Sequence, residues 1–202
     1  MTRGRQPEHS REKILNKGLE LFARQGYNAT GLKEILDTCE VSKGSFYNFF
    51  GNKEQFAIEI IEHYKSIEFA RWDEQMEALQ GSHLSKIAWM LNDAVKKYEQ
   101  DSNCVGCLLT NLTGEVSQAS PLFSNTIRAS ANEVLDAIEN DMVLCQQEGS
   151  VRTDLTARQL AEIIWSGWQG ALLRVKVEST ITPLKNHIET ILTLIKTTTP
   201  QG

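Results

Sequence analysis

The sequence predicts an all-α fold, and three observations support that prediction. Apolar residues recur at spacings of three and four along most of the 202 residues, which is the period of an amphipathic helix. The alternation typical of strands is missing, and the one β-branched run, at residues 178–182, is short. The four prolines lie near the termini or at expected helix starts, so long segments are free to form helices. A hydrophobic content of 41% is sufficient for a folded core.

The first expected helix covers residues 11–26. Ser10 is the candidate N-cap, because its hydroxyl can accept a hydrogen bond from an unpaired N–H of the first turn. Gly26 is the expected C-terminal stop. The apolar residues that this helix turns inward are Ile14, Leu15, Leu19, Leu21 and Phe22.

Two short helices are expected next, joined by a tight turn. Thr30 is the candidate N-cap of the first, which ends at residues 38–40. Its inward stripe, at i, i+3, i+4 spacing, consists of Leu32, Ile35 and Leu36. Ser42 is the candidate N-cap of the second helix, and Gly51 stops it. The inward stripe of the second helix repeats the spacing with Phe46, Phe49 and Phe50.

The outer face of the second short helix is small, hydroxylated, amide-bearing or cationic. It carries Lys43, Gly44, Ser45, Tyr47 and Asn48. Such side chains suit phosphate oxygens and base edges better than a protein core. Two helices that meet at a short turn, the second with a DNA-like face, form a helix-turn-helix. The sequence therefore predicts binding to double-stranded operator DNA, and the remaining alternative for this segment is a helical hairpin with a solvated polar face.

The rest of the chain reads as helices with few breaks. Asn52 is expected to cap a long helix that runs to residue 79, and Pro121 suits the first turn of another. The remaining expected helices cover residues 82–100, 107–118, 121–147, 156–176 and 183–196. No low-complexity linker occurs, so the boundary between a DNA-binding domain, residues 1–55, and a second domain, residues 56–202, is expected within the helix that begins at Asn52.

The distribution of charge agrees with DNA binding, although the net charge of the chain is −5. Residues 1–55 carry nine Lys and Arg against seven Asp and Glu, whereas residues 56–202 carry twelve against nineteen. Positive charge is therefore concentrated where the helix-turn-helix is expected. A modestly basic domain favours a specific dimeric operator binder over a protein that coats DNA non-specifically. Lys53, which follows the motif, is a further candidate for a phosphate contact.

The last two expected helices are the candidate dimer surface. The helix at residues 156–176 is more apolar than one buried stripe requires. The last helix has a regular stripe that consists of Ile188, Ile191, Leu192 and Ile195. Packing of both helices within their own subunit is the alternative.

The four cysteines raise a second functional hypothesis. Cys39 and Cys145 fall within helical patterns and read as core thiols, whereas Cys104 and Cys107 cross a loop into a helix start. A thiol in the first turn of a helix lies at the positive end of the helix dipole, which favours the reactive thiolate. One Cys-x-x-Cys pair is half a zinc site, and the four histidines are scattered, so we expect neither a metal nor a cofactor. Two ordinary small residues at a tight turn are the alternative.

The segments LFARQGYNAT, GLKEIL, VSKGSFYNFF and NKEQF resemble the TetR family of transcriptional repressors. The resemblance implies a TetR-type all-α subunit with an N-terminal three-helix DNA-binding domain, a C-terminal ligand-sensing domain, and a homodimer whose last two helices form a four-helix interface. It assigns DNA binding to Thr30, Lys43, Gly44, Ser45, Tyr47, Asn48 and Lys53.

A second resemblance concerns the effector. The segments GCLLTNLTGEVS and WSGWQGALLRVKVESTITPL are similar to the NemR and AcuR-like branch of that family, whose members sense reactive electrophiles or oxidants. Cys107 falls at the GC motif of the branch and Lys176 at its late-helix lysine, which implies sensing at Cys107 with Cys104 and Lys176 nearby. Lys176 at a helix end can equally offset the helix dipole.

Other functions fit parts of the sequence less well. A regulator that binds its effector reversibly would use a pocket lined by Trp89, Leu112, Phe123, Trp165 and Trp168. A thiol-disulfide enzyme at Cys104 and Cys107 would need a βαβ pattern that is missing, and a helical interaction protein would leave Lys43, Tyr47 and Asn48 unexplained. We expect a regulator and not an enzyme. The polar N-terminus and the lack of a long apolar run favour a cytoplasmic protein without a membrane span.

Overall fold

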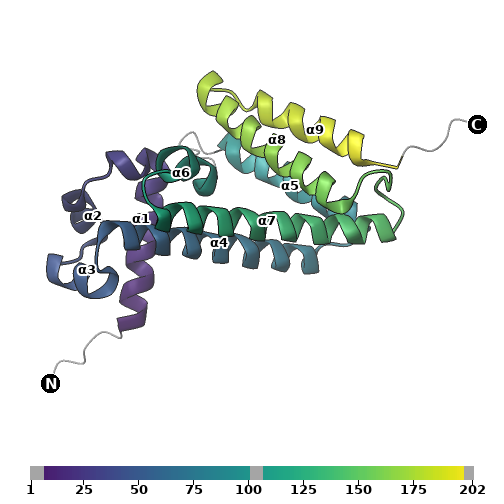
Figure 1. The fold of residues 1–202 in the computed structure, drawn as a ribbon. Coiled ribbons are helices and arrows are strands. Elements are labelled where there is room, and N and C mark those ends of the chain that lie inside the picture. Colours follow the sequence, from purple (N-terminus) through teal and green to yellow (C-terminus); the bar gives the residue numbers. More distant parts are fainter. Residues whose placement is uncertain (1–6, 101–106, 198–202) are drawn as a thin grey trace, which may run out of the picture. The chain divides into compact units, whose positions relative to one another are not determined.

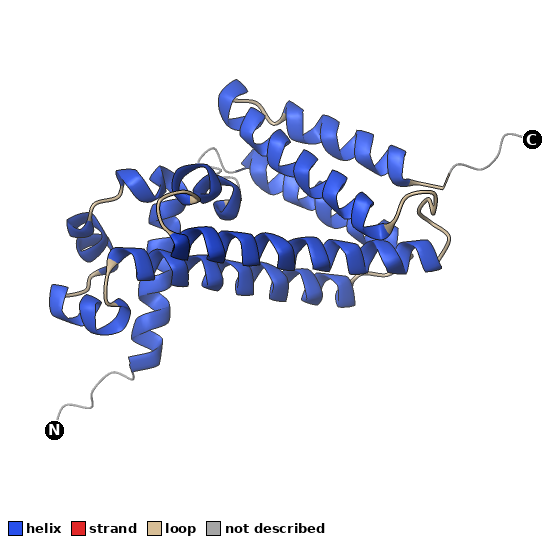
Figure 2. Ribbon diagram, in the orientation of Figure 1, coloured by secondary structure: helices blue, strands red, loops and turns tan. Residues whose placement is uncertain are grey.

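A computed structural model of the chain describes residues 7–100 and 107–197, and these residues form nine helices and no strand (Figures 1 and 2). The all-α prediction is therefore confirmed. The helices are α1 (Pro7–Ala29), α2 (Leu32–Cys39), α3 (Lys43–Phe50), α4 (Lys53–Ala78), α5 (His83–Gln100), α6 (Leu108–Val116), α7 (Pro121–Gln147), α8 (Ala157–Glu178) and α9 (Thr182–Ile195). No described helix combines the length and the apolar character that crossing a membrane requires.

The chain forms two compact units. Unit 1 consists of Met1–Phe69 and Cys107–Ser130, and unit 2 consists of Ala70–Gly106 and Ala131–Gly202. Unit 1 thus contains α1, α2, α3 and α6 together with the first parts of α4 and α7. Unit 2 contains α5, α8 and α9 together with the later parts of α4 and α7.

The core of unit 1 is built on aromatic side chains. Phe22 of α1, Phe46 of α3 and Phe56 of α4 are fully buried. The ring of Phe56 lies edge-on to the other two, with ring centroids 5.8 Å from Phe22 and 5.1 Å from Phe46, a favourable aromatic geometry. Helix α1 also packs against α2 and α6. The core therefore joins the DNA-binding segment to α6 through α1.

The end of α1 differs from the sequence-based expectation. Gly26, the expected stop, does interrupt the helical conformation, with φ 80° and ψ 177°, but α1 comprises two helical stretches joined at this kink and extends to Ala29. The N-cap of α2 is Gly31, so the prediction that Thr30 caps this helix is wrong. Thr30 is fully buried, and its hydroxyl donates a hydrogen bond of 2.6 Å to the carbonyl of Gly26 and accepts one of 3.2 Å from Gln25. The hydroxyl of Thr30 therefore binds the backbone four residues before it and is not available to cap α2.

The predicted caps at Ser42 and Asn52 are confirmed, whereas Ser10 lies within α1, which begins at Pro7, and therefore does not cap it. The Ser42 hydroxyl accepts from the Ser45 amide at 3.1 Å, and the Asn52 side chain accepts from the Gln55 amide at 2.8 Å. Helix α8 begins with a capping box in which the Thr156 hydroxyl and the Gln159 side chain each bind the other's backbone N–H. Local side-chain chemistry thus fixes where α3, α4 and α8 begin.

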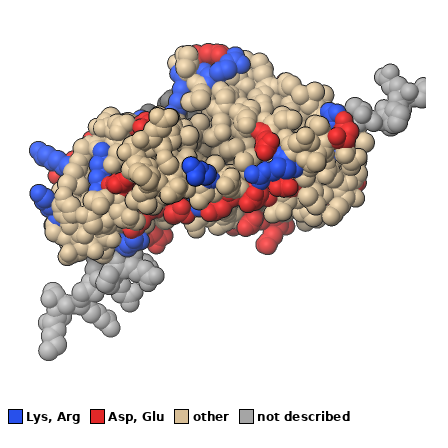
Figure 3. All heavy atoms as spheres, viewed as in Figure 1, with Lys and Arg blue, Asp and Glu red and all other residues tan. Residues whose placement is uncertain are grey.

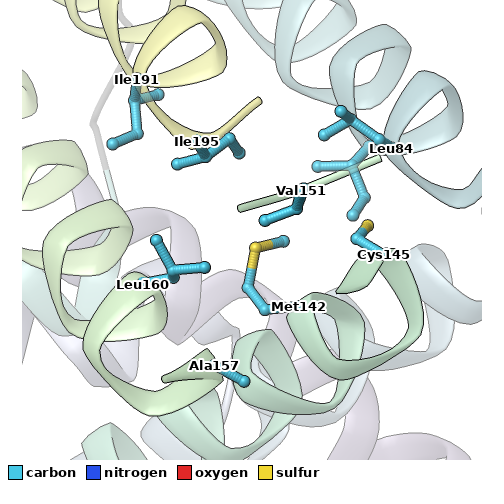
Figure 4. Close-up of a cluster of buried hydrophobic side chains, with 9 residues drawn as sticks. Leu84, Met142, Cys145, Val151, Ala157, Leu160, Ile191 and Ile195 are labelled. Atoms are coloured by element: carbon cyan, nitrogen blue, oxygen red, sulfur yellow. The ribbon is translucent and has the colours of Figure 1, made fainter. Parts of the chain in front are cut away.

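The core of unit 2 gathers side chains from α5, α7, α8, α9 and the segment between α7 and α8. Figure 4 shows Met142 and Cys145 of α7 pointing into this cluster beside Val151. Burial raises the pKa of the Cys145 thiol to about 11, so this thiol stays protonated at neutral pH. An isolated antiparallel bridge between Val151 and Lys196 holds the segment before α8 to the end of α9.

Helices α8 and α9 divide their apolar side chains between two faces. Ile188, Ile191 and Ile195 of α9 are buried within their own subunit, so this regular stripe supplies the core of unit 2 and not the dimer surface. A different set of apolar side chains is exposed to solvent in the single chain. This set consists of Ile163, Leu173 and Val177 of α8 and Leu194 of α9, with exposed fractions of 47%, 51%, 86% and 55%.

Candidate DNA-binding interface and effector region

The predicted recognition face lies on the outside of α3. Lys43, Gly44, Ser45, Tyr47 and Asn48 are all exposed, and 42% of Tyr47 is accessible to solvent. Phe46 and Phe50, from the same helix, are buried beneath them, while Phe49 is half-buried. Figure 3 shows Lys and Arg side chains projecting from the end of unit 1 that carries α2 and α3. The face is polar, cationic and free of packing against its own unit, as an element that enters a DNA groove must be.

The turn between α2 and α3 is held against α1. Glu40 adopts the left-handed conformation with φ 55° and lies 3.0 Å from Lys17 and 3.4 Å from Lys13 of α1. These two ammonium groups lower the pKa of the Glu40 carboxyl. The Cys39 thiol is buried at the same turn, and burial raises its pKa to about 11. Ion pairs and packing together fix the angle at which α3 leaves the core.

Lys53 is oriented inward in this structure. Its ammonium group donates a 2.7 Å hydrogen bond to the carbonyl of Tyr27 and lies 4.0 Å from the centre of the Tyr27 ring. Burial lowers the pKa of Lys53, and the Glu115 carboxylate opposes that shift. Its predicted phosphate contact stays a prediction, because Lys53 would have to leave these partners to make it. Thr30 was also a predicted DNA contact. Its side chain is instead buried and hydrogen-bonded inside unit 1.

Replacement of Gly44 by alanine tests the interface, because it is expected to stabilise the fold and to weaken DNA binding. A Cβ at this position would meet no atom of the protein within 4 Å, so the fold itself does not require glycine there. Alanine is expected to raise the free energy of unfolding by roughly 0.5 kcal/mol, because glycine weakens helices. The added methyl group is nevertheless expected to weaken operator binding several-fold, because it stands on the face that approaches DNA. Chemical denaturation and a DNA titration of Gly44→Ala measure the two effects, and unchanged affinity would remove Gly44 from the interface.

The predicted effector residues fall in different places. Cys107 is the N-cap of α6 in unit 1, and only 7% of it is exposed. Its side chain forms no capping hydrogen bond. Cys104 lies outside the described residues. Lys176 is exposed in the last turn of α8, in unit 2. Cys39, Cys107 and Cys145 are the described cysteines, and all three are free and buried.

The residues proposed to line a reversible pocket are divided between the units. Leu112 and Phe123 are buried in the core of unit 1. Trp89, Trp165 and Trp168 belong to unit 2, where 49% of Trp89 is exposed and the Trp168 ring lies 6.5 Å from that of Tyr98. Unit 2 also has an open depression of about 430 Å³, lined by Asp73, Met76, Glu77, His83 and Lys86, none of which was predicted to bind a ligand.

The sequence did not reveal the role of Glu115, the residue that connects α6 to the DNA-binding segment. Its carboxylate accepts a 3.0 Å hydrogen bond from the backbone N–H of Asn28, and the Asn28 side chain donates to the Glu115 carbonyl at 3.5 Å. A Cβ at Gly26 would overlap the same carboxylate. The partners are 87 residues apart, so no local pattern indicated this contact.

An exposed polar helix that carries a lysine, within a helix-turn-helix and followed by a larger set of helices, is typical of a DNA-binding regulator. Two family models match the chain. Residues 14–60 match the bacterial regulatory proteins of the tetR family, and residues 84–191 match the tetracyclin repressor-like C-terminal domain. The chain belongs to the TetR family of transcriptional regulators.

Individual relatives support the same assignment. The HTH-type transcriptional repressor NemR of Escherichia coli is 27% identical over 94% of this chain and 96% of its own length. The transcriptional regulator AcuR of Cereibacter sphaeroides is 33% identical over 89% of this chain and 82% of its own length. The crystal structure of reduced E. coli NemR superposes with a TM-score of 0.86, covering 96% of this chain and all of that one.

Proposed function

We propose that this chain is a dimeric repressor whose operator affinity falls when a reactive electrophile modifies Cys107. It acts as a regulator and not as an enzyme, in the cytoplasm, where operator DNA lies. The observation that carries the proposal is the placement of α6. Cys107 occupies the N-cap position at one end of this helix. Glu115, near the other end, binds the segment of α1 that leads into the helix-turn-helix.

The position of Cys107 favours a sensing role. Cys107 lies at the N-terminus of α6, where peptide dipoles place partial positive charge. Burial raises the pKa of the Cys39 and Cys145 thiols to about 11, which makes these two thiols poor nucleophiles at neutral pH. The related NemR was crystallised in a form described as reduced, and we extend a thiol-dependent response to this chain on that likeness.

The response can travel within unit 1. A substituent on Cys107 adds volume beside the buried residues Leu108 and Leu109 of α6. Closely packed helices respond to added volume by shifting as rigid elements. A shift of α6 would carry Glu115 with it, and through Asn28 it would move the end of α1 and the start of α2. The proposed result is a change in the spacing of the two recognition helices of the dimer.

A gel-shift assay on DNA from beside the chain's own gene tests the proposal. Acrolein, an α,β-unsaturated aldehyde, is expected to release the protein, whereas propanal, its saturated analogue, is expected to have no effect. Release by acrolein should persist after dilution, because a covalent bond has formed. Release that reverses on dilution would support a reversible pocket instead, and no binding to any fragment in either state would contradict operator binding.

Glu115 is expected to be required for transmission. Glu115→Ala removes the acceptor for the Asn28 amide, so modification of Cys107 should change operator affinity less than tenfold, compared with roughly a hundredfold in the parent protein. Glu115→Gln keeps an acceptor oxygen of the same reach and should retain most of the response. Titration of operator DNA before and after acrolein treatment measures both variants. An undiminished response in Glu115→Ala would show that the signal takes another route.

A further inference from the structure

The N-terminus of α6 resembles a capping box whose hydrogen bonds are missing. Cys107 is the N-cap and Thr110 occupies the third helical position, the two places that exchange hydrogen bonds in such a box. Helix α8 of the same protein shows the complete arrangement, in which the Thr156 hydroxyl accepts from the Gln159 amide at 3.2 Å and the Gln159 side chain accepts from the Thr156 amide at 2.9 Å. In α6 the Cys107 side chain forms no capping bond.

The Thr110 hydroxyl has no hydrogen-bond partner among the described residues. Only 7% of Thr110 is exposed, and its oxygen atom, like that of Ser130, is buried without a partner in the described structure. Thr113, one turn further along α6, does have a partner, because its hydroxyl donates a hydrogen bond of 2.6 Å to the Leu109 carbonyl. A buried hydroxyl without a partner destabilises a fold, so its presence beside a free thiol calls for an explanation.

Cys107 and Thr110 occupy the N-cap and third helical positions of α6, which lie on the same side of the first turn of a helix. Side chains in a helix tilt toward its N-terminus, and residues three apart share a face. The site therefore combines a thiol, an unpaired hydroxyl and the positive end of a nine-residue helix, next to the buried apolar residues Leu108 and Leu109. Such a site suits a small uncharged molecule that offers one electrophilic carbon and one hydrogen-bond-accepting oxygen.

We infer that the Thr110 hydroxyl binds the carbonyl oxygen of the electrophile that adds to Cys107, which makes α,β-unsaturated aldehydes and related carbonyl compounds the preferred effectors. This inference rests on the proposed function. The Cys107 sulfur forms a bond to the β-carbon, and the π electrons of the C=C bond move to give an enolate. The proton of the thiol ends on the α-carbon, so no oxidant, reductant or leaving group is involved.

Thr110 would assist only those electrophiles that carry a carbonyl oxygen. Negative charge develops on the carbonyl oxygen as the sulfur–carbon bond forms, and a hydrogen bond in apolar surroundings stabilises that charge more than it would in water. An oxidant such as hypochlorite has no carbonyl group, so its reaction with Cys107 would not depend on this hydrogen bond. Thr110 is therefore a residue that determines which electrophile reacts, while Cys107 remains the residue that reacts.

A pair of reagents that differ in the carbonyl oxygen tests the inference. Acrolein and allyl bromide both alkylate thiols, but allyl bromide has no oxygen. Thr110→Val preserves the shape of the side chain and removes the hydroxyl. This variant is expected to slow acrolein addition at Cys107 about tenfold, as the loss of one hydrogen bond implies, and to leave the rate with allyl bromide unchanged. Mass spectrometry with fragment ions that separate Cys107 from Cys104 gives both rates on the full chain.

Two further variants serve as controls. Thr113→Val removes a hydroxyl that is already bonded on the same helix and should leave both rates unchanged. Thr110→Ser keeps the hydroxyl and should retain the preference for acrolein, even if Thr110→Val folds poorly. Equal rates for Thr110→Val and the parent, or an equal slowing with both reagents, would overturn the role of Thr110 alone. If neither reagent modifies Cys107 in the parent protein, the proposed function fails as well.

Discussion

Cys107→Ser is expected to bind operator DNA as the parent protein does and to remain bound after treatment with acrolein. The parent is expected to lose roughly a hundredfold in affinity, which corresponds to a shift of ~3 kcal/mol between the binding and the released state. A serine hydroxyl does not add to α,β-unsaturated aldehydes at neutral pH, so the variant should lose less than twofold. A DNA titration before and after treatment compares the two proteins.

The substitution should not damage the fold, which makes a lost response easy to interpret. Serine is a strong N-cap residue, and α6 lacks a side-chain cap at Cys107. Its hydroxyl can accept the backbone N–H two or three residues later, so the free energy of unfolding should stay the same or rise by up to ~1 kcal/mol. A fall in thermal stability would show that the thiol contributes to packing.

Other cysteines provide the controls for this prediction. Cys145→Ala should release DNA normally, because the Cys145 thiol is buried in the core of unit 2 and its pKa is raised. Cys104→Ser should keep its response to acrolein, which alkylates Cys107 without forming a disulfide. With hypochlorite, a two-electron oxidant, this variant should lose the response if a disulfide between Cys104 and Cys107 forms the switch, and should keep most of it if Cys104 only assists. Release of Cys107→Ser as readily as the parent would reject the thiol hypothesis in favour of a reversible pocket.

The double variant Leu173→Asp, Val177→Asp is expected to be monomeric and to lose at least a hundredfold in operator affinity. The two side chains lie one turn apart on α8, and 51% and 86% of them are exposed in the single chain. Burial of apolar surface is the main driving force for obligate dimers, and two buried carboxylates on each subunit would oppose it. A monomer presents one recognition helix where a two-fold related operator offers two half-sites.

Light scattering and a DNA titration measure these effects at the same protein concentration. Leu144→Asp is the matched control, because Leu144 is a similarly exposed residue, at 45%, on α7 and outside the two last helices. It should remain dimeric and bind DNA. The double variant should keep its helix content by circular dichroism, since neither residue supports the core. A dimer in the double variant would move the interface to another surface.

The sequence predicted most helix boundaries because they depend on local chemistry. The range of α7 agrees at both ends, since Pro121 favours a helix start and Gly149 follows its end with φ 71°. Ser42 and Asn52 cap their helices as expected. The outer face of α3 was also identified correctly as exposed, because aromatic residues at fixed spacing determine which side is buried.

The differences arose where distant residues decide the structure. The inward orientation of Lys53 depends on Tyr27, 26 residues earlier in the chain. Thr30 is an exception, because the Gly26 carbonyl that binds its hydroxyl lies only four residues before it. The stripe containing Ile188 was a candidate dimer surface, with packing inside its own subunit as the alternative, and the structure buries Ile188 in the single chain. Periodicity indicates that a face is apolar, but it does not indicate which partner covers that face.

The burial of Cys107 has a consequence for the timing of regulation under the proposed mechanism. Because only 7% of the residue is exposed, an electrophile would reach the thiol mainly when this region opens locally, so adducts would form more slowly than on a fully exposed thiol. Each adduct then persists after the electrophile has been cleared. The fraction of released operator would follow the cumulative dose, concentration multiplied by time, and recovery would depend on synthesis of new repressor.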